Sequence, residues 1–123
     1  MRDMDLVREL LLYLDKVDFR LGSPKNVFPE IEGYSSNQID HHLALMCSAG
    51  FLNDEGMDLA TGFAFCGLTW KGYELLDSIR DDDVWRKTKG GLQSAGGFTF
   101  DLVKDLAKGF LKKQIEEKTG ITL

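Results

Sequence analysis

Cysteines and long apolar runs are scarce in this sequence. Its 123 residues include only two cysteines, Cys47 and Cys66, each alone on an apolar stretch. This usage indicates reduced thiols in a core rather than a disulfide framework. No apolar run approaches the roughly 18 residues of a membrane-spanning helix, and the start of the chain lacks the apolar segment of a secretion signal. We therefore expect a cytoplasmic protein without membrane contacts.

Basic side chains are missing from one long stretch. Between Lys25 and Lys71 there is no Lys or Arg. The same stretch contains six acidic residues, namely Glu30, Glu32, Asp40, Asp54, Glu55 and Asp58. Binding to nucleic acid draws most of its affinity from Lys and Arg on phosphates. This stretch, together with the net charge of −5, therefore favours a protein partner over DNA.

Signatures of catalysis, cofactors and metals are also missing. The Gly90-Gly91 and Gly96-Gly97 pairs lack the spacing and the following Lys-Ser/Thr of a phosphate-binding loop. His41 and His42 are adjacent on a predicted helix and point about 100° apart, so they do not match metal-ligand spacing with the cysteines. We expect His42 at the edge of the core and His41 in water. The sequence predicts no enzyme, no cofactor and no metal site.

Apolar spacing predicts a mixture of helices and short strands. Residues 4–17 carry apolar side chains at helical spacing. Residues 18–33 contain both prolines and predict a loop with at most one short strand around 26–28. A β-hairpin is predicted from strands over 51–54 and 63–68.

The best-marked helix begins after Ser35. Ser35 and Gln38 form a capping box, in which each side chain bonds the other residue's backbone N–H. Gly50 is placed to end the helix in the left-handed conformation. The predicted buried face consists of three apolar residues one turn apart: Ile39, Leu43 and Met46.

Two further helices are predicted after the hairpin. Thr69 caps a helix over 70–80, whose predicted apolar face is Tyr73, Leu76 and Ile79. The acidic run Asp81 to Asp83 is typical of a helix start, because carboxylates cap the free N–H groups and favour the dipole. It opens a short helix that holds Val84, Trp85 and Leu92, followed by a glycine-rich joint.

The last predicted helix is amphipathic. Thr99 caps it, and it continues to about Lys118. Four apolar residues form a stripe along it, which we expect either to dock on its own domain or to pair two copies of the chain: Leu102, Leu106, Phe110 and Ile115. Its lysines either belong to a solvated face with i,i+4 partners or form a phosphate-binding stripe.

Two sequence patterns resemble known proteins. The first joins the capped helix to the following helix: Ile39, His42, Leu43, Met46, Ala49, Gly50, Phe51 and Leu52, then Leu68, Thr69, Gly72, Leu75, Leu76 and Asp77. It resembles the core of winged-helix proteins. The second consists of the R-D-M-D-L-x-R start at Arg2 and the I-R-D-D-x-x-W-x-K motif from Ile79 to Lys87. It resembles an uncharacterised family of short bacterial and phage proteins.

The resemblance implies an α+β fold, with a winged-helix-like domain over residues 1–92 and a C-terminal helix over 98–119. That helix is either part of the domain or a dimerisation element. The resemblance implies a bacterial, phage or prophage setting and no activity. One departure is that the segment before Ser35 does not predict the first helix of a helix-turn-helix pair.

Two functions remain from the sequence. The first is a regulatory protein-interaction module, whose predicted partner-binding residues are Asn37, Gln38, Asp40, His41, Asp54, Glu55 and Asp58. The alternative is a dimeric, sequence-specific DNA-binding regulator. Its predicted contacts are Asn37, Gln38, His41, Arg86, Lys87, Lys89, Lys104, Lys108 and Lys112, because amides read adenine edges and cations hold phosphates.

Overall fold

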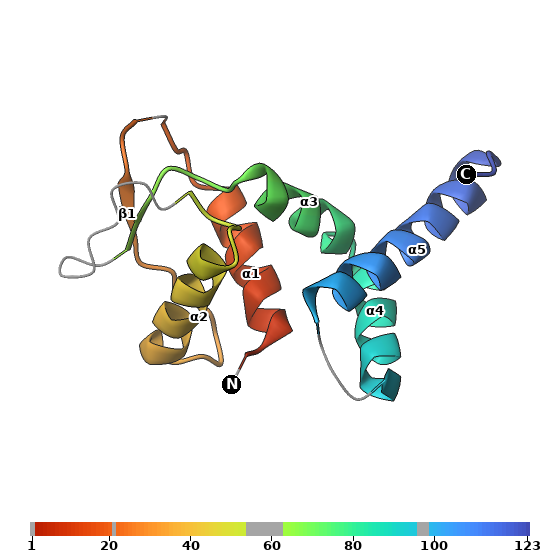
Figure 1. Cartoon of the computed structure of the whole chain (residues 1–123), viewed down its shortest axis with the longest axis horizontal. Coiled ribbons are helices and arrows are strands. Elements are labelled where there is room, and N and C mark those ends of the chain that lie inside the picture. The colour runs from red at the N-terminus through yellow and green to blue at the C-terminus, as the bar shows by residue number, and fades with distance from the viewer. Residues whose placement is uncertain (1, 21, 54–62, 96–98) are drawn as a thin grey trace. The chain divides into compact units, whose positions relative to one another are not determined.

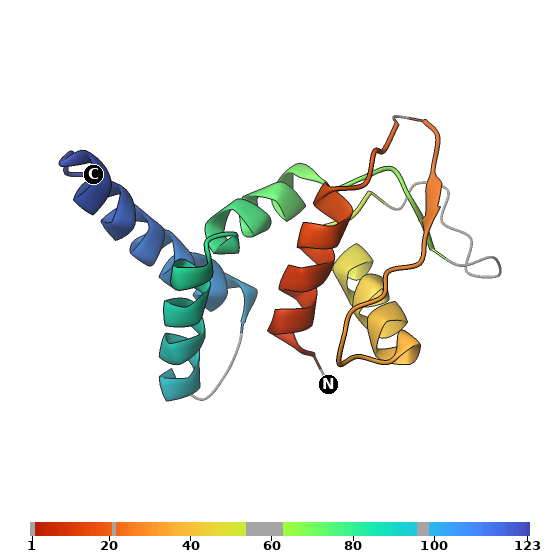
Figure 2. The same cartoon turned by 180° about the vertical axis from the view of Figure 1, so that it is seen from behind.

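The computed structural model describes residues 2–20, 22–53, 63–95 and 99–123. In these ranges the chain forms five helices and one two-stranded sheet (Figure 1 and Figure 2): α1 Met4–Asp15, β1 Lys25–Val27, α2 Ser36–Ser48, β2 Phe63–Phe65, α3 Trp70–Ile79, α4 Asp82–Ala95 and α5 Phe100–Thr119. The chain divides into two compact units, Met1–Leu76 and Asp77–Leu123. The expected combination of helices and strands is confirmed, and the fold is mostly helical with one small antiparallel sheet. None of the described helices is long and apolar enough to cross a membrane.

In the first unit, α1 and α2 lie side by side in both views. The helical spacing of leucines on α1 places one apolar face inward, and α2 contributes its own apolar face. The fully buried side chains include Leu6, Leu10, Leu11 and Leu14 of α1 with Leu43 and Met46 of α2. Removing these side chains from water is the main driving force for joining the two helices.

Both ends of α2 form as their residues predict. The Ser35 hydroxyl accepts from the Gln38 backbone N–H, and the Gln38 side chain accepts from the Ser35 N–H, which confirms the capping box. Gly50 has a φ of 82°, a left-handed conformation that glycine adopts without strain. The Phe51 N–H then donates to the Met46 carbonyl at 3.0 Å, so the chain turns back on the last turn.

The sheet combines the short strand before α2 with the strand before α3. β1 and β2 are antiparallel, with Lys25 opposite Phe65 and Val27 opposite Phe63. The predicted hairpin is confirmed at its base, where Leu52 and Leu68 form an isolated bridge. The sequence did not predict that β2 would pair with β1, because strand partners distant in sequence leave no local signal.

The start of α3 is packed tightly against the end of α2. The Thr69 hydroxyl accepts from the Gly72 N–H at 3.1 Å and donates to the Gly50 carbonyl at 2.5 Å. A Cβ at position 72 would collide with the Phe51 carbonyl oxygen, so only glycine fits there. The predicted apolar face of this helix was wrong at Tyr73, which is 42% exposed; Leu75 is buried instead, beside Leu76 and Ile79.

In the second unit, α4 and α5 pack on each other. Asp81 caps α4, since its carboxylate accepts from the N–H groups of Val84 and Asp83, and these bonds lower its pKa. The predicted joint was wrong at Gly90 and Gly91, which lie inside α4; Gly96 and Gly97 lie outside the described residues. A Cβ at Gly91 would lie 3.4 Å from the Leu106 side chain, so the small residue permits close packing.

Candidate interaction surfaces

The outward face of α2 is polar and contains no basic side chain. Asn37, Asp40 and His41 are exposed on it, as the sequence predicts for a contact surface. Gln38 is exposed too, but its side-chain oxygen already accepts the Ser35 N–H at 2.8 Å. Of the four predicted α2 contacts, Gln38 therefore caps the start of the helix, and the side chains of the other three are exposed to solvent.

His42 belongs to the interior. It is 3% exposed, and its Nδ1 lies 2.8 Å from the Gln38 carbonyl. A carbonyl oxygen only accepts, so Nδ1 carries the proton and Nε2 accepts from the Asp3 backbone N–H at 2.8 Å. This places His42 in a structural role, as expected. No cluster of three metal-ligating side chains occurs among the described residues.

Tyr34 adds a second link to Asp3. Its hydroxyl donates to Asp3 Oδ2 at 2.9 Å, while Asp3 Oδ1 caps α1 by accepting from the N–H groups of Asp5 and Leu6. Burial, the bond to Asp3 and nearby carboxylates raise the pKa of Tyr34 to about 12. No local pattern in the sequence indicates this cluster, because its members are far apart along the chain.

An acidic hollow adjoins the start of α2. It has a volume of about 540 Å³ and is lined by residues of the segment before α2 and by Ser36 and Ile39 of α2. Its charged lining side chains are Glu30 and Glu32, and its apolar ones include Ile31. The hollow therefore places two carboxylates beside the first turn of α2. The predicted contacts Asp54, Glu55 and Asp58 lie outside the described residues.

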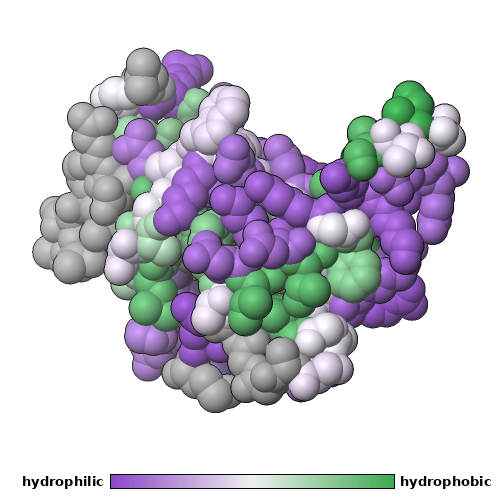
Figure 3. Space-filling model, turned by 45° about the vertical axis from the view of Figure 1, so that its right-hand side comes forward, coloured by the Kyte–Doolittle hydropathy of each residue, from purple (hydrophilic) through white to green (hydrophobic). Residues whose placement is uncertain are grey.

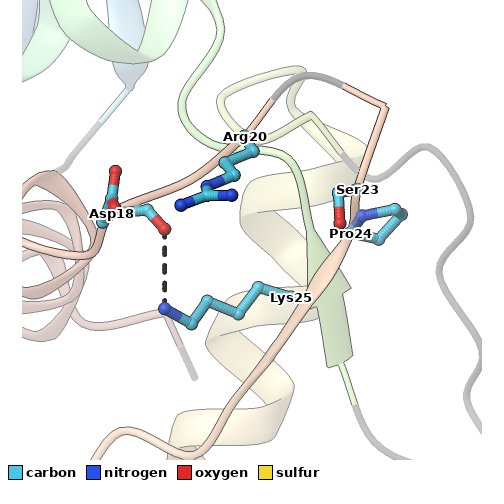
Figure 4. Close-up of a pocket in the computed structure, with 5 residues that line it drawn as sticks. All are labelled: Asp18, Arg20, Ser23, Pro24 and Lys25. Atoms are coloured by element: carbon cyan, nitrogen blue, oxygen red, sulfur yellow. Dashed lines mark hydrogen bonds between the residues drawn. The ribbon is translucent and has the colours of Figure 1, made fainter.

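A smaller, basic hollow of about 300 Å³ lies between α1 and β1 (Figure 4). The chain turns tightly before it, because the Ser23 N–H donates to the Arg20 carbonyl and Gly22 takes a φ of 75°. Lys25 Nζ lies 3.5 Å from the Asp18 carbonyl oxygen, and Figure 4 shows the Arg20 guanidinium on the same side of the turn. The charged residues that line this hollow are therefore Arg20, Lys25 and Asp18.

The predicted DNA-contacting cations of the second unit are interspersed with acidic groups. Arg86 pairs with Asp83 at 3.1 Å, Lys89 lies over the Trp85 ring and Lys104 over the Phe100 ring. A hollow of about 190 Å³ contains Lys87 together with Lys113 and Lys118, but also Asp83 and Glu117. Lys108 and Lys112 are exposed. This arrangement favours the solvated face over a continuous phosphate-binding stripe.

The family follows from a match that covers most of the chain. A family model described as hypothetical protein DUF2513 matches residues 1–98. The chain belongs to the DUF2513 family. An uncharacterized protein of Haemophilus influenzae is 30% identical over 118 residues, which cover 93% of this chain and 98% of that protein. No solved structure matches the chain. The resemblance to a family of unknown function is thereby confirmed.

In this DUF2513 protein, α5 begins after the range that the family model matches. Its inward face consists of Val103 and Ala107, both fully buried. The predicted oligomerisation stripe is divided, since Leu106 and Phe110 are half-buried whereas Leu102 and Ile115 are 45% and 40% exposed. Apolar side chains also cover the end of the C-terminal segment, at the upper right of Figure 3, where Ile121 and Leu123 are exposed.

Proposed function

We propose that this DUF2513 protein is a non-enzymatic, regulatory protein-interaction module that binds its partner through α2. The observation that carries this proposal is the character of the α2 surface. Asn37, Asp40 and His41 are exposed there without a basic neighbour on the helix, and the adjoining hollow adds Glu30 and Glu32. A surface of this kind repels a phosphate backbone and attracts a basic protein surface.

The charge of the first unit supports the same partner class. Residues 1–76 contain six basic and twelve acidic side chains, whereas residues 77–123 contain nine and eight. Charges of this kind act mainly by steering the partner during association. The partner therefore presents a basic surface, and its association rate falls as salt screens the attraction.

The first unit is proposed to be a variant of the winged helix. Its order of helix, strand, helix, strand and helix, with the two strands paired, is consistent with that frame. Residues 28–35 contain no helix, so the pair of helices that presents a recognition helix to DNA is incomplete. The missing helix is compatible with a winged-helix variant that contacts a protein instead of the major groove of DNA.

The proposal is tested by replacing carboxylates with amides of nearly the same shape, which removes the negative charge. The variant Glu30→Gln, Glu32→Gln, Asp40→Asn is compared with Asp101→Asn, Asp105→Asn, which removes acidic charges from α5. A pull-down from the native host, with nuclease-treated and untreated lysates in parallel, supplies the partner. Association rates are then measured against salt. We expect the α2 variant to associate several-fold more slowly at low salt and to converge with wild type at high salt. An unchanged rate at low salt contradicts the proposal.

A second candidate function is DNA binding, and the basic hollow of Arg20 and Lys25 favours it. The hollow includes Lys25 of β1, the strand before α2. Its partner β2 follows α2, as the strands that reach the DNA backbone in a winged helix follow the recognition helix. Two cations are fewer than the six to ten phosphate contacts of strong binders. Capture that disappears after nuclease treatment would place this function first.

A further inference from the structure

Trp70 is the most exposed large apolar side chain of the described residues. It is the first residue of α3 and is 81% exposed, whereas Trp is highly buried on average in folded proteins. Its indole N–H donates to Glu74 Oε1 at 3.0 Å. This bond joins residues one turn apart and holds the ring against the helix. The ring is therefore presented to solvent in an ordered position with a carboxylate at its edge.

Within the described ranges, other aromatic rings lie under a lysine. Lys71 lies over Phe51 at 5.5 Å, Lys89 over Trp85 at 5.9 Å and Lys104 over Phe100 at 5.6 Å, measured from Nζ to the ring centre. Within the described parts of the chain, Trp70 has no such cation. Indole is the best cation-binding ring among the aromatic side chains. Of the two indoles of this protein, Trp85 lies under a lysine, and Trp70 remains open to an external cation.

The lysine next to Trp70 is turned toward α2. Lys71 Nζ donates to the Ala49 carbonyl at 3.0 Å, in addition to its position over Phe51. Tyr73 is half-exposed three residues after Trp70, and Glu74 follows, so all three lie on one side of α3. An exposed Trp and Tyr beside a carboxylate form a surface that can stack on a planar cation and hydrogen bond to it.

We propose that Trp70 and Glu74 form a receptor for an arginine side chain of the protein partner. The guanidinium stacks on the indole face and donates to the Glu74 carboxylate. Arginine fits better than lysine, because its group is planar, is more weakly hydrated and offers several donors in a fixed fork. Charge complementarity supports this occupant, since the first unit contains twice as many acidic as basic side chains. The inference rests on the proposed function, because it specifies the basic partner.

A synthetic peptide tests the receptor without knowledge of the partner. The probe is a glycine peptide with three arginines, compared with the same peptide carrying three lysines. Binding is followed by NMR at the indole N–H signals of Trp70 and Trp85, the two tryptophans. We expect the arginine peptide to shift the Trp70 signal with saturation and to bind at least threefold more tightly than the lysine peptide. Glu74→Gln should weaken this binding several-fold, and Asp101→Asn should leave it unchanged. No shift, or equal binding of both peptides, overturns the proposal.

Trp70→Leu distinguishes this inference from the proposed function. The side chain is exposed and leucine is a good helix former, so the variant is expected to fold. We expect it to weaken capture of the pulled-down partner about tenfold, as removal of an aromatic anchor commonly does. Capture at wild-type affinity, with a slower rate in the α2 charge variant, rejects the arginine receptor alone. A tenfold loss with no effect of the α2 charges rejects the α2 surface and keeps the receptor.

Discussion

His42 and Asp3 are joined across 39 positions of the sequence by one hydrogen bond, from the Asp3 backbone N–H to His42 Nε2 at 2.8 Å. Since the other ring nitrogen donates to the Gln38 carbonyl, the ring connects the start of α1 to α2 through both nitrogens. The adjacent His41 is exposed and contacts its neighbour edge to face. The two histidines therefore have different roles although they are consecutive in the sequence.

We expect His42→Ala to lower the free energy of unfolding by about 1–3 kcal/mol, because it leaves the part-buried Asp3 N–H without its acceptor. The matched control, His41→Ala, should change it by less than about 0.5 kcal/mol, as is usual for surface substitutions. Urea unfolding measures both. Equal effects would show that the bond to Asp3 does not stabilise the fold.

Tyr34 predicts a loss of stability at alkaline pH. Its pKa is about 12 in the folded chain against 10.0 ordinarily, so folding favours the neutral hydroxyl that donates to Asp3. Its contribution is fully present below pH 10 and is lost as pH rises through 12. Wild type should therefore lose stability relative to Tyr34→Phe over this window. Ultraviolet absorbance should show a tyrosine of wild type that ionises near pH 12, and Tyr34→Phe should lack this step. The same absorbance step near pH 12 in Tyr34→Phe would contradict the assignment.

Two glycines should respond oppositely to alanine. Gly72→Ala places a Cβ against the Phe51 carbonyl, which is backbone and cannot move aside, so we expect a loss of more than about 1 kcal/mol. At Gly90, inside α4, a Cβ meets nothing within 4 Å, so Gly90→Ala should stabilise the chain by about 0.5–1 kcal/mol. Thermal unfolding of both variants measures the difference. A gain at position 72 would refute the close approach.

Features encoded by neighbouring residues could be predicted from the sequence, and features that join distant residues could not. The capping box of α2 depends on Ser35 and Gln38 alone, and it forms as predicted. The bond between Tyr34 and Asp3 spans 31 positions, and nothing near either residue indicates the other. Gly90 and Gly91 indicated a break by their low helix propensity, but the surrounding helix outweighs that local cost.

The surface was predicted unevenly for the same reason. Exposure of Asn37, Asp40 and His41 follows from the position of the buried face of α2, which three apolar residues already define. The exposed Trp70 could not be predicted from its residue type, which favours burial. Only the packing of α3 decides which of its apolar residues face outward.

The apolar residues of α5 should separate into two classes. Val103→Asp places a carboxylate where the exposed fraction of the side chain is zero. We therefore expect the free energy of unfolding to fall by more than about 2 kcal/mol. Leu102→Asp with Ile115→Asp changes exposed side chains and should leave melting unchanged. Light scattering on the double variant tests pairing of two copies. We expect an unchanged mass; a halved mass would show that these two residues hold a second copy.

Binding to duplex DNA should be weak. At near-physiological salt, titration against a pool of random duplexes should give a dissociation constant no tighter than ordinary non-specific binding, on the order of 10⁻⁴–10⁻⁶ M. The reason is that the outward face of α2 offers no cation, and the cations of Arg20 and Lys25 are too few to replace the missing phosphate contacts. Any residual binding should depend on these two residues.

The variant Arg20→Gln, Lys25→Gln tests that dependence, with Lys108→Gln, Lys112→Gln as a control of equal charge change on α5. The slope of log affinity against log salt is negative, and each lost phosphate contact reduces its magnitude by about 0.9. Loss of both contacts should therefore reduce the magnitude of the slope by about 2. If the α5 variant flattens the slope instead, the lysines of α5 contact the phosphates. Nanomolar selection of one sequence by wild type would rank DNA binding above the protein-interaction function, because a surface without phosphate anchors cannot produce it.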